Sequence, residues 1–221
     1  MSPPRPRILV NCAVSVDGRL AYAGGRRARL SGPEDLVRVH RMRSEVGAIL
    51  VGAGTVIADD PSLRVHWELL GTPPRPGPTR IVLDGRGRIP ETARVLDGST
   101  PTIIAVSERC ERRFPPVVET LVAGADEVEL PKLWSALSAR GIASVMVEGG
   151  GNVIASVLRS GLFDRMTVYV APVVIGGRTA PSLAIGMESP DDRSVVPVRF
   201  EAAERLGEGL LVTYGPKSPA A

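Results

Sequence analysis

The sequence is poor in aromatic residues, cysteine and histidine, and each shortage argues against a class of function. Phenylalanine, tryptophan and tyrosine make up 4% of the 221 residues, which disfavours an aromatic platform for stacking nucleic-acid bases. The two cysteines, Cys12 and Cys110, lie far apart in no paired spacing, so neither a disulfide framework nor a zinc site is indicated. The two histidines form none of the arrangements used by serine hydrolases or zinc enzymes, and we predict no metal site.

Long apolar runs and a strong charge imbalance are also missing. The longest apolar stretches are well short of the roughly 20 residues that a membrane-spanning helix needs, and the N-terminus lacks the apolar core of a signal peptide. We therefore expect a cytoplasmic protein that does not bind membranes. The net charge is +3 with arginines spread along the chain, and this distribution favours a basic pocket for an anionic small molecule over nucleic-acid binding.

Short β-branched runs alternate with helical patterns, which predicts a single α/β domain over residues 1–221 with an ordered core of about 7–215. The last two predicted strands, 198–205 and 210–214, form an antiparallel hairpin. The remaining strands are expected at 8–14, 48–51, 80–83, 102–106, 127–130, 144–147 and 166–174. Helices are expected at 31–46, 132–140 and directly after the glycines at 149–151, with irregular segments at 67–79 and 176–197.

The strongest local signal is the segment SVMVEGGGNVIASVL at residues 144–158. An apolar strand ends in Glu148, three glycines follow, and a helix begins at once. Glycines allow backbone N–H groups to approach an anion, and a helix N-terminus adds a favourable dipole. The pattern is neither GxGxxG nor a P-loop, so a pyrophosphate cradle and a plain glycine-rich turn both stay open. Glu148 either faces a ligand or bonds nearby backbone N–H groups.

Other polar residues are candidates with simpler alternatives. Asn11 lies inside an apolar strand and needs a specific partner. The helix that contains HRMRSE carries Arg43, which can bind a phosphate, although a solvated basic face is the commoner explanation of such arginines. His40 is expected on the exposed part of that helix in a structural role. His66, which follows the carboxylates of DDPSLRVHW, is the more interesting histidine.

Two turn sequences follow predicted strands. Asp17-Gly18 is typical of a simple turn. DGRGRIP at 84–90 is either a tight turn or a ligand-binding edge, because ligands bind beyond the carboxyl ends of strands in such sheets. Arg86 and Arg88 in this segment could bind an additional phosphate.

Taken together, these segments resemble the pyrimidine reductase family of riboflavin biosynthesis, which shares a dihydrofolate-reductase-like fold. The resemblance spans roughly residues 7–215. It implies an α/β fold with a mixed, mostly parallel central sheet flanked by helices, a C-terminal antiparallel hairpin and, by analogy, a homodimer. It rests on S-V-D-G at 15–18, the capped helix ending in Arg43, G-A-G-T-V-I-A-D-D-P-S-L at 52–63, I-V-L-D-G at 81–85, V-E-G-G-G at 147–151, and D-R-M-T-V-Y-V-A-P at 164–172 followed by G-G at 176–177.

The resemblance implies hydride transfer from NADPH, with NADH as the open alternative, to C1′ of a phosphorylated ribosylaminopyrimidine. Glu148 is the implied catalytic residue, which polarises the substrate; proton donation by it is a hypothesis. The implied cofactor-binding residues are Ala13, Thr55, Asp59, Leu83, Asp84, Gly85, Gly149, Gly150, Gly151, Asn152 and Val153. The implied substrate-binding residues are Asn11, Arg27, Arg43, Leu63, His66 and Glu148.

Departures from the bacterial pattern bear on the substrate. Bacterial reductases usually carry lysine at the position of Asn11 and arginine at that of His66, and the archaeal and fungal branch resembles the Asn/His pattern better. The zinc deaminase signature that is commonly fused to the bacterial enzyme is absent. We therefore favour 2,5-diamino-6-ribosylamino-4(3H)-pyrimidinone 5′-phosphate as substrate. The alternatives are 5-amino-6-(5-phosphoribosylamino)uracil and a non-catalytic NADPH-binding regulatory protein. Arg27 departs from the small polar residue of the family.

Overall fold

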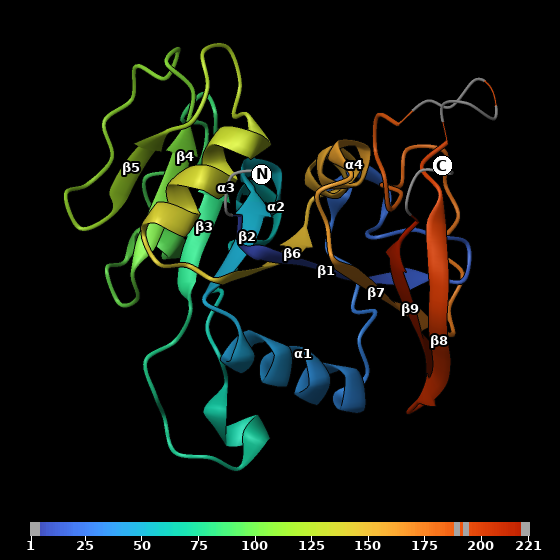
Figure 1. Cartoon of the computed structure of the whole chain (residues 1–221). Coiled ribbons are helices and arrows are strands. Elements are labelled where there is room, and N and C mark those ends of the chain that lie inside the picture. Colours follow the sequence, from blue (N-terminus) through green and yellow to red (C-terminus); the bar gives the residue numbers. More distant parts are fainter. Residues whose placement is uncertain (1–4, 188–190, 192–194, 218–221) are drawn as a thin grey trace. The chain divides into compact units, whose positions relative to one another are not determined.

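The computed structural model describes residues 5–187, 191 and 195–217 (Figure 1). Two compact units make up this part of the chain. The first contains residues 37–150 together with the described residues up to Arg7, and the second contains residues 8–36 and the described residues from Gly151 onward. Helix α1 (Pro33–Glu45) begins in the second unit and continues into the first.

The first unit is built on five parallel strands. Their spatial order is β5-β4-β3-β2-β6, with each neighbouring pair parallel (Figure 1). Every residue of β2 and β4 is buried, and apart from Thr102 neither strand has a polar side chain, as expected for parallel strands covered on both faces. The strands are β2 (Ala48–Gly52), β3 (Thr79–Leu83), β4 (Thr102–Val106), β5 (Glu119–Val122) and β6 (Ser144–Gly149).

Two α-helices lie wholly within the first unit. Helix α3 (Leu130–Ala139) has a proline in its first turn and buries Leu133, Trp134 and Leu137 at helical spacing. Helix α2 (Ala53–Asp59) follows β2 directly. Two short 3-10 helices, Trp67–Leu70 and Arg94–Leu96, interrupt the loops.

The second unit contains four strands in the order β1-β7-β9-β8. Strands β1 (Arg7–Ser15) and β7 (Arg165–Ala171) are parallel, while β9 (Gly209–Pro216) is antiparallel to β7 and to β8 (Val198–Leu206). The unit also contains α4 (Gly151–Ser160), with buried Val153, Ile154 and Val157, and the short 3-10 helix Ala23–Gly25. The predicted α/β class, its mostly parallel strands and the C-terminal hairpin are confirmed.

One predicted strand is wrong and one helix was missed. Residues 127–129 precede α3 and Leu130 begins it, so 127–130 form no strand, and the fifth parallel strand is β5 at Glu119–Val122. The alternation in Glu-Val-Glu-Leu imitates a strand, whereas β5 buries only Leu121 and so lacks a clear pattern. Helix α2 was missed because its glycine-containing start has low helix propensity.

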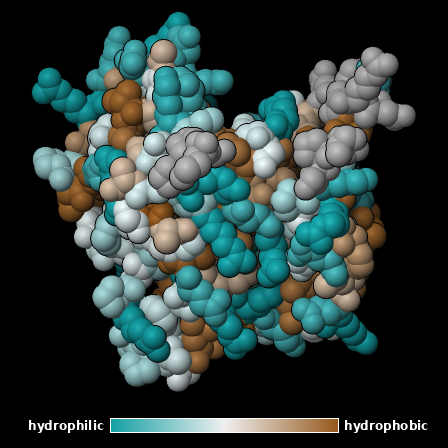
Figure 2. Space-filling model, in the orientation of Figure 1, coloured by the Kyte–Doolittle hydropathy of each residue, from teal (hydrophilic) through white to brown (hydrophobic). Residues whose placement is uncertain are grey.

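Among the described residues, no helix is both long enough and apolar enough to cross a membrane. On the face drawn in Figure 2, hydrophobic residues lie among hydrophilic ones. The irregular segment predicted at 176–197 is irregular through Met187, and residues 188–190 and 192–194 lie outside the described residues.

Candidate active site

A buried ion pair connects α1 to the end of β6 in the first unit. Arg43 donates from Nε to Oε1 of Glu148 at 2.6 Å and from Nη2 to Oε2, so the two side chains form a two-point fork. The exposed fractions of the two side chains are 16% and 8%. A third hydrogen bond, from Nη1 of Arg43 to the carbonyl oxygen of Arg64, measures 2.9 Å.

A β-bulge determines where Glu148 lies. Along the β2–β6 ladder Leu50 faces Val147, but the next residue, Val51, faces Gly149. Glu148 is therefore the extra residue on β6. A bulge re-aims the side chain that it displaces, and here it presents a carboxylate to Arg43 at the end of an otherwise apolar strand.

One face of α1 carries both Arg43 and His40, since residues three apart in a helix are neighbours. His40 is buried, with an exposed fraction of 6%. Its Nδ1 accepts the backbone N–H of His66 at 3.1 Å, and the two imidazole rings stack with centroids 4.6 Å apart. The prediction that His40 is exposed is wrong, because the segment before Trp67 packs over that part of the helix.

The charges in this cluster shift two pKa values. Burial opposes the charge of Arg43, but the attraction and hydrogen bonds of Glu148 outweigh it, so the pKa of the guanidinium is raised. Burial, with smaller contributions from Arg43 and His66, lowers the pKa of His40 from 6.5 to about 4. At neutral pH the cluster therefore holds a charged arginine beside a neutral His40.

The segment 60–66 carries unusual backbone. Asp60 ends α2 at φ 39°, and Leu63 has φ 51°; such values are uncommon for residues other than glycine, and surrounding contacts must hold them in place. One such contact joins Oδ1 of Asp60 to the backbone N–H of Arg94 at 2.8 Å. The side chain of Leu63 is 2% exposed, whereas His66 is exposed, so His66 is the side chain of this pair that a ligand can reach.

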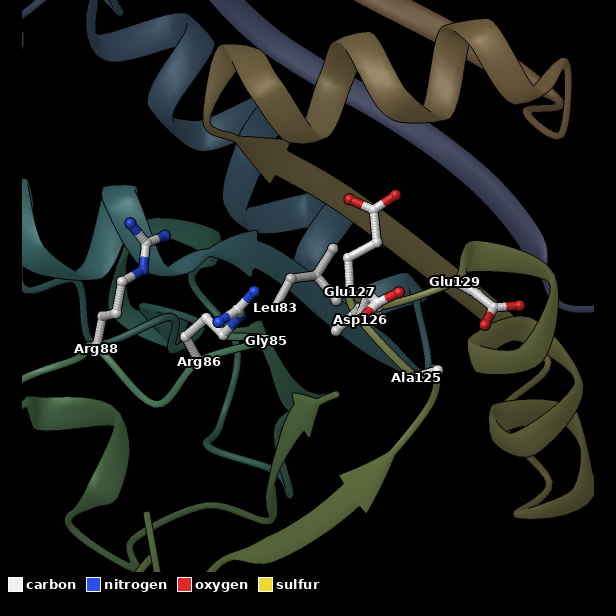
Figure 3. Close-up of a pocket in the computed structure, with 9 residues that line it drawn as sticks. Leu83, Gly85, Arg86, Arg88, Ala125, Asp126, Glu127 and Glu129 are labelled. Atoms are coloured by element: carbon white, nitrogen blue, oxygen red, sulfur yellow. The ribbon is translucent and has the colours of Figure 1, made fainter. Parts of the chain in front are cut away.

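The turn after β3 borders a pocket of about 790 Å³ in the first unit (Figure 3). Arg86 and Arg88 lie on one side of it, and the segment 125–129 with its acidic side chains lies on the other. Asp84 is fully buried and accepts the backbone N–H groups of Arg88 and Ile89 at 2.8 and 2.9 Å. Its carboxylate therefore organises the turn, and Leu83 and Gly85 are the predicted cofactor residues that line the pocket.

The glycines after Glu148 have different roles. Gly150 has φ 79°, a conformation that favours glycine, and a Cβ on Gly149 would lie 3.6 Å from Oγ1 of Thr55. In the second unit, a Cβ on Gly151 would come within 2.6 Å of the carbonyl oxygen of Ser182. Gly151 thus allows α4 to pack closely against the irregular segment that contains Ser182 and Ile185.

The other predicted residues of the second unit occupy varied environments. The specific partner expected for Asn11 is Thr167, whose Oγ1 donates to Oδ1 of Asn11 at 2.8 Å. Ala13 is partly buried, Arg27 and Asn152 are exposed, and Val153 is buried. In the first unit, Asp59 is the last residue of α2.

The turn at Asp17 is tied to a second predicted motif within the same unit. Its carboxylate accepts the backbone N–H groups of Ile175 and Gly176 at 2.9 and 2.8 Å. The Oγ of Ser15 also donates to Oδ1 of Asp17, at 2.7 Å. The hydrogen bond from Ile175 and then that from Ser15 lower the pKa of Asp17 to about 2. The S-V-D-G and G-G segments therefore form one structural connection.

Sequence reasoning missed two members of the α1 cluster. His40 was set aside, although its spacing of three from Arg43 places both on one helix face. The carbonyl oxygen of Arg64, which accepts from Arg43, gives no sequence signal because every residue has one.

Comparison with known proteins identifies relatives of this chain. The RibD C-terminal domain family matches residues 6–212. The 2,5-diamino-6-ribosylamino-4(3H)-pyrimidinone 5′-phosphate reductase of Archaeoglobus fulgidus is 39% identical over 95% of this chain and 97% of its own length. The reductase of the same name from Methanothermobacter thermautotrophicus is also 39% identical, over 96% of this chain and 99% of its own.

Longer relatives match over part of their length. The riboflavin biosynthesis protein RibD of Bacillus amyloliquefaciens is 33% identical over 96% of this chain and 58% of its own. The crystal structure of the diaminohydroxyphosphoribosylaminopyrimidine deaminase/5-amino-6-(5-phosphoribosylamino)uracil reductase of Thermotoga maritima superimposes with a TM-score of 0.80 at 27% identity. The match covers 96% of this chain and 57% of that protein.

Proposed function

Because the chain belongs to the RibD C-terminal domain family, we propose that it reduces 2,5-diamino-6-ribosylamino-4(3H)-pyrimidinone 5′-phosphate to the ribitylamino compound in riboflavin biosynthesis. The observation that carries this substrate is the 39% identity to two archaeal reductases of that name, over nearly the full length of each. The chain is an oxidoreductase of a family that uses a nicotinamide cofactor.

The nicotinamide supplies a hydride when it is bound. The acceptor is C1′ of the opened ribose, so the C=N bond becomes a single bond when carbon gains the hydride and nitrogen gains a proton. Positive charge on this nitrogen makes the carbon a better acceptor. We assign Glu148 to stabilise that charge, because its carboxylate is 8% exposed and is held at two points by Arg43.

Arg43 also has the capacity to bind the substrate phosphate. A guanidinium has five N–H donors, and Arg43 uses three hydrogen bonds for Glu148 and Arg64. The exposed imidazole of His66 lies on the same segment as Arg64. We propose that these groups bind substrate together with Leu63, Asn11 and Arg27.

The pocket beside β3 suits the adenosine end of the cofactor. Its volume of about 790 Å³ falls in the range of small-molecule sites. Arg86 and Arg88 supply positive charge for a phosphate on one side, and the carboxylates of Asp126, Glu127 and Glu129 line the other. An arginine is the usual partner of the additional 2′-phosphate of NADPH, whereas an acidic residue binds the corresponding hydroxyl of NADH. We assign Arg86 and Arg88 to that phosphate and therefore propose NADPH as the cofactor.

The remaining cofactor contacts come from several elements. We propose as further cofactor contacts the residues that the family resemblance implies: Thr55, Asp59, Ala13, Gly149, Gly150, Gly151, Asn152 and Val153, with backbone positions at Leu83, Asp84 and Gly85. Of these α4 residues, Gly151 and Val153 are buried and Asn152 is exposed, so the backbone and the Asn152 amide are the groups we assign to the cofactor.

The direct test is NADPH consumption with each candidate pyrimidine phosphate, followed by mass spectrometry of the product. We expect the diaminopyrimidinone to gain two hydrogens and to have the higher kcat/KM. A higher kcat/KM for the aminouracil would reassign the substrate and keep the reductase. Binding of NADPH with no turnover of either compound would favour a regulatory protein instead.

We also propose that the protein is a homodimer. Strand β8 is the outer strand of the second unit, and Phe200 on it is 61% exposed. Val174, which follows β7, is 75% exposed. An edge strand with exposed apolar side chains is suited to association with a second copy. Light scattering of the purified chain should give twice the 23.4 kDa of one copy, and a single-copy mass would reject the dimer.

A further inference from the structure

We propose that His40 is a positioning residue, which fixes the segment 60–66 and the exposed imidazole of His66 against α1. His40 holds the segment through the hydrogen bond that its Nδ1 accepts from the backbone N–H of His66, at 3.1 Å. The substrate-binding consequence rests on the proposed function, whereas the positioning itself does not.

The segment needs such a contact because its backbone does not hold itself. Residues 60–66 lie outside any helix or strand, and Asp60 and Leu63 both have positive φ. Strained backbone persists only where its surroundings determine it. Helix α1 supplies two contacts from one face: Nη1 of Arg43 to the carbonyl oxygen of Arg64, and Nδ1 of His40 to the N–H of His66.

The chemistry at position 40 must be that of a neutral acceptor. An imidazole that accepts at Nδ1 carries its proton at Nε2. A protonated ring would have an N–H at Nδ1 and would face the N–H of His66 as one donor facing another. Burial keeps the pKa of His40 at about 4, so the acceptor form persists at neutral pH.

The stacked rings extend the effect to the His66 side chain. The centroids lie 4.6 Å apart with an interplanar angle of 29°, and only His66 of the two is exposed. His40 thus orients a side chain that a ligand can reach, without being reachable itself. Because Arg43 and His40 share the helix face, this imidazole is held in the same cluster as Glu148.

The test compares His40→Leu, which removes the acceptor, with His40→Asn, whose Oδ1 replaces Nδ1. Arg41→Leu, on an exposed position of the same helix, is the matched control. Amide hydrogen exchange at His66 is measured first, because it does not depend on activity. We expect exchange about tenfold faster in His40→Leu, and near wild-type exchange in His40→Asn and Arg41→Leu, as for loss of one buried hydrogen bond.

Steady-state kinetics then report the consequence for substrate. We expect KM for the pyrimidine to rise about tenfold in His40→Leu and to recover in His40→Asn, while the Kd for NADPH stays unchanged in both. Unchanged exchange at His66 in His40→Leu, or equal impairment of the Leu and Asn variants, would overturn the positioning role. If the variants show the expected exchange pattern but the wild-type protein reduces neither pyrimidine, the proposed function is rejected and the positioning role stands.

Discussion

Arg43 and Glu148 lie 105 positions apart in the sequence, yet Nε of the arginine is 2.6 Å from Oε1 of the glutamate. The pair joins a helix to the bulge at the end of β6. Removing one member of a buried pair leaves the other charge without its partner, at a cost larger than the interaction itself. Substitutions at either position therefore change the local charge as well as a ligand contact.

Arg43→Lys should lower kcat/KM by roughly tenfold or more, because an ammonium group cannot reproduce the two-point fork of the guanidinium. Both KM and kcat should change, since phosphate binding and the position of Glu148 are affected together. Steady-state kinetics with varied pyrimidine measure both values. A change in KM alone would show that Arg43 binds substrate without orienting Glu148.

Glu148→Gln should retain a hydrogen bond to Arg43 and lose the negative charge. We expect kcat to fall about a hundredfold while the Kd for NADPH changes little, because the carboxylate stabilises the positive charge that the nitrogen gains on protonation, before the hydride reaches the carbon. Titration of NADPH by fluorescence and single-turnover kinetics separate the two effects. Near wild-type kcat in this variant would remove Glu148 from the catalytic role.

Gly151→Ala and Gly54→Ala should shift stability in opposite directions. A Cβ on Gly151 would lie 2.6 Å from Cγ1 of Ile185, whereas a Cβ on Gly54 meets nothing within 4 Å. Overpacking costs about 1–3 kcal/mol. Replacing glycine by alanine in a helix, where the added methyl group meets no neighbour, stabilises by roughly 0.5–1 kcal/mol. Thermal unfolding should show a lower Tm for the first and a higher Tm for the second. The same sign of change in both would contradict the packing assigned to Gly151.

Arg80→Ala should lower the free energy of unfolding by about 1–3 kcal/mol, because it leaves the buried hydroxyl of Thr102 without its donor. The Arg80 side chain has no exposed area and donates to Oδ1 of Asp97 and to Oγ1 of Thr102. Arg64 also pairs with Asp97 but is 45% exposed, so Arg64→Ala should cost less than about 1 kcal/mol. Urea denaturation measures both, and equal losses would show that burial of Arg80 is not decisive.

His40 should make the protein less stable as the pH falls. Its pKa is lowered from 6.5 to about 4 on folding, so between these values the unfolded chain binds the proton more readily. The stability that neutral His40 contributes is fully present above pH 6.5 and is lost as the pH decreases through that window. At about pH 5 the free energy of unfolding is lower by about 2 kcal/mol. His40→Asn should reduce this dependence in urea denaturation at about pH 7 and pH 5. An identical pH dependence in both proteins would contradict it.

Much of the fold could be predicted because many strands and helices have a pattern of residues that is visible within the element itself. The apolar run of β2 and the short connection between the last two runs, which marks the terminal hairpin, are both visible without reference to the rest of the chain. The prediction fails where the pattern of residues within a segment differs from the structure that the segment adopts when it packs against the rest of the chain. Residues 127–130 alternate like a strand but lead into the first residue of α3, and β5 is an edge strand with a single buried residue.

The sequence by itself determined the α/β class and the family pattern, and it supplied the candidate site residues, including Arg43, His66 and Glu148. Only the tertiary structure decided that Arg43 pairs with Glu148, that Glu148 is the extra residue of a bulge, and that His40 is buried beneath His66. The physical reason is that helix and strand periodicity depends on near neighbours. Ladder register and the packing of an irregular segment depend on residues distant in the chain.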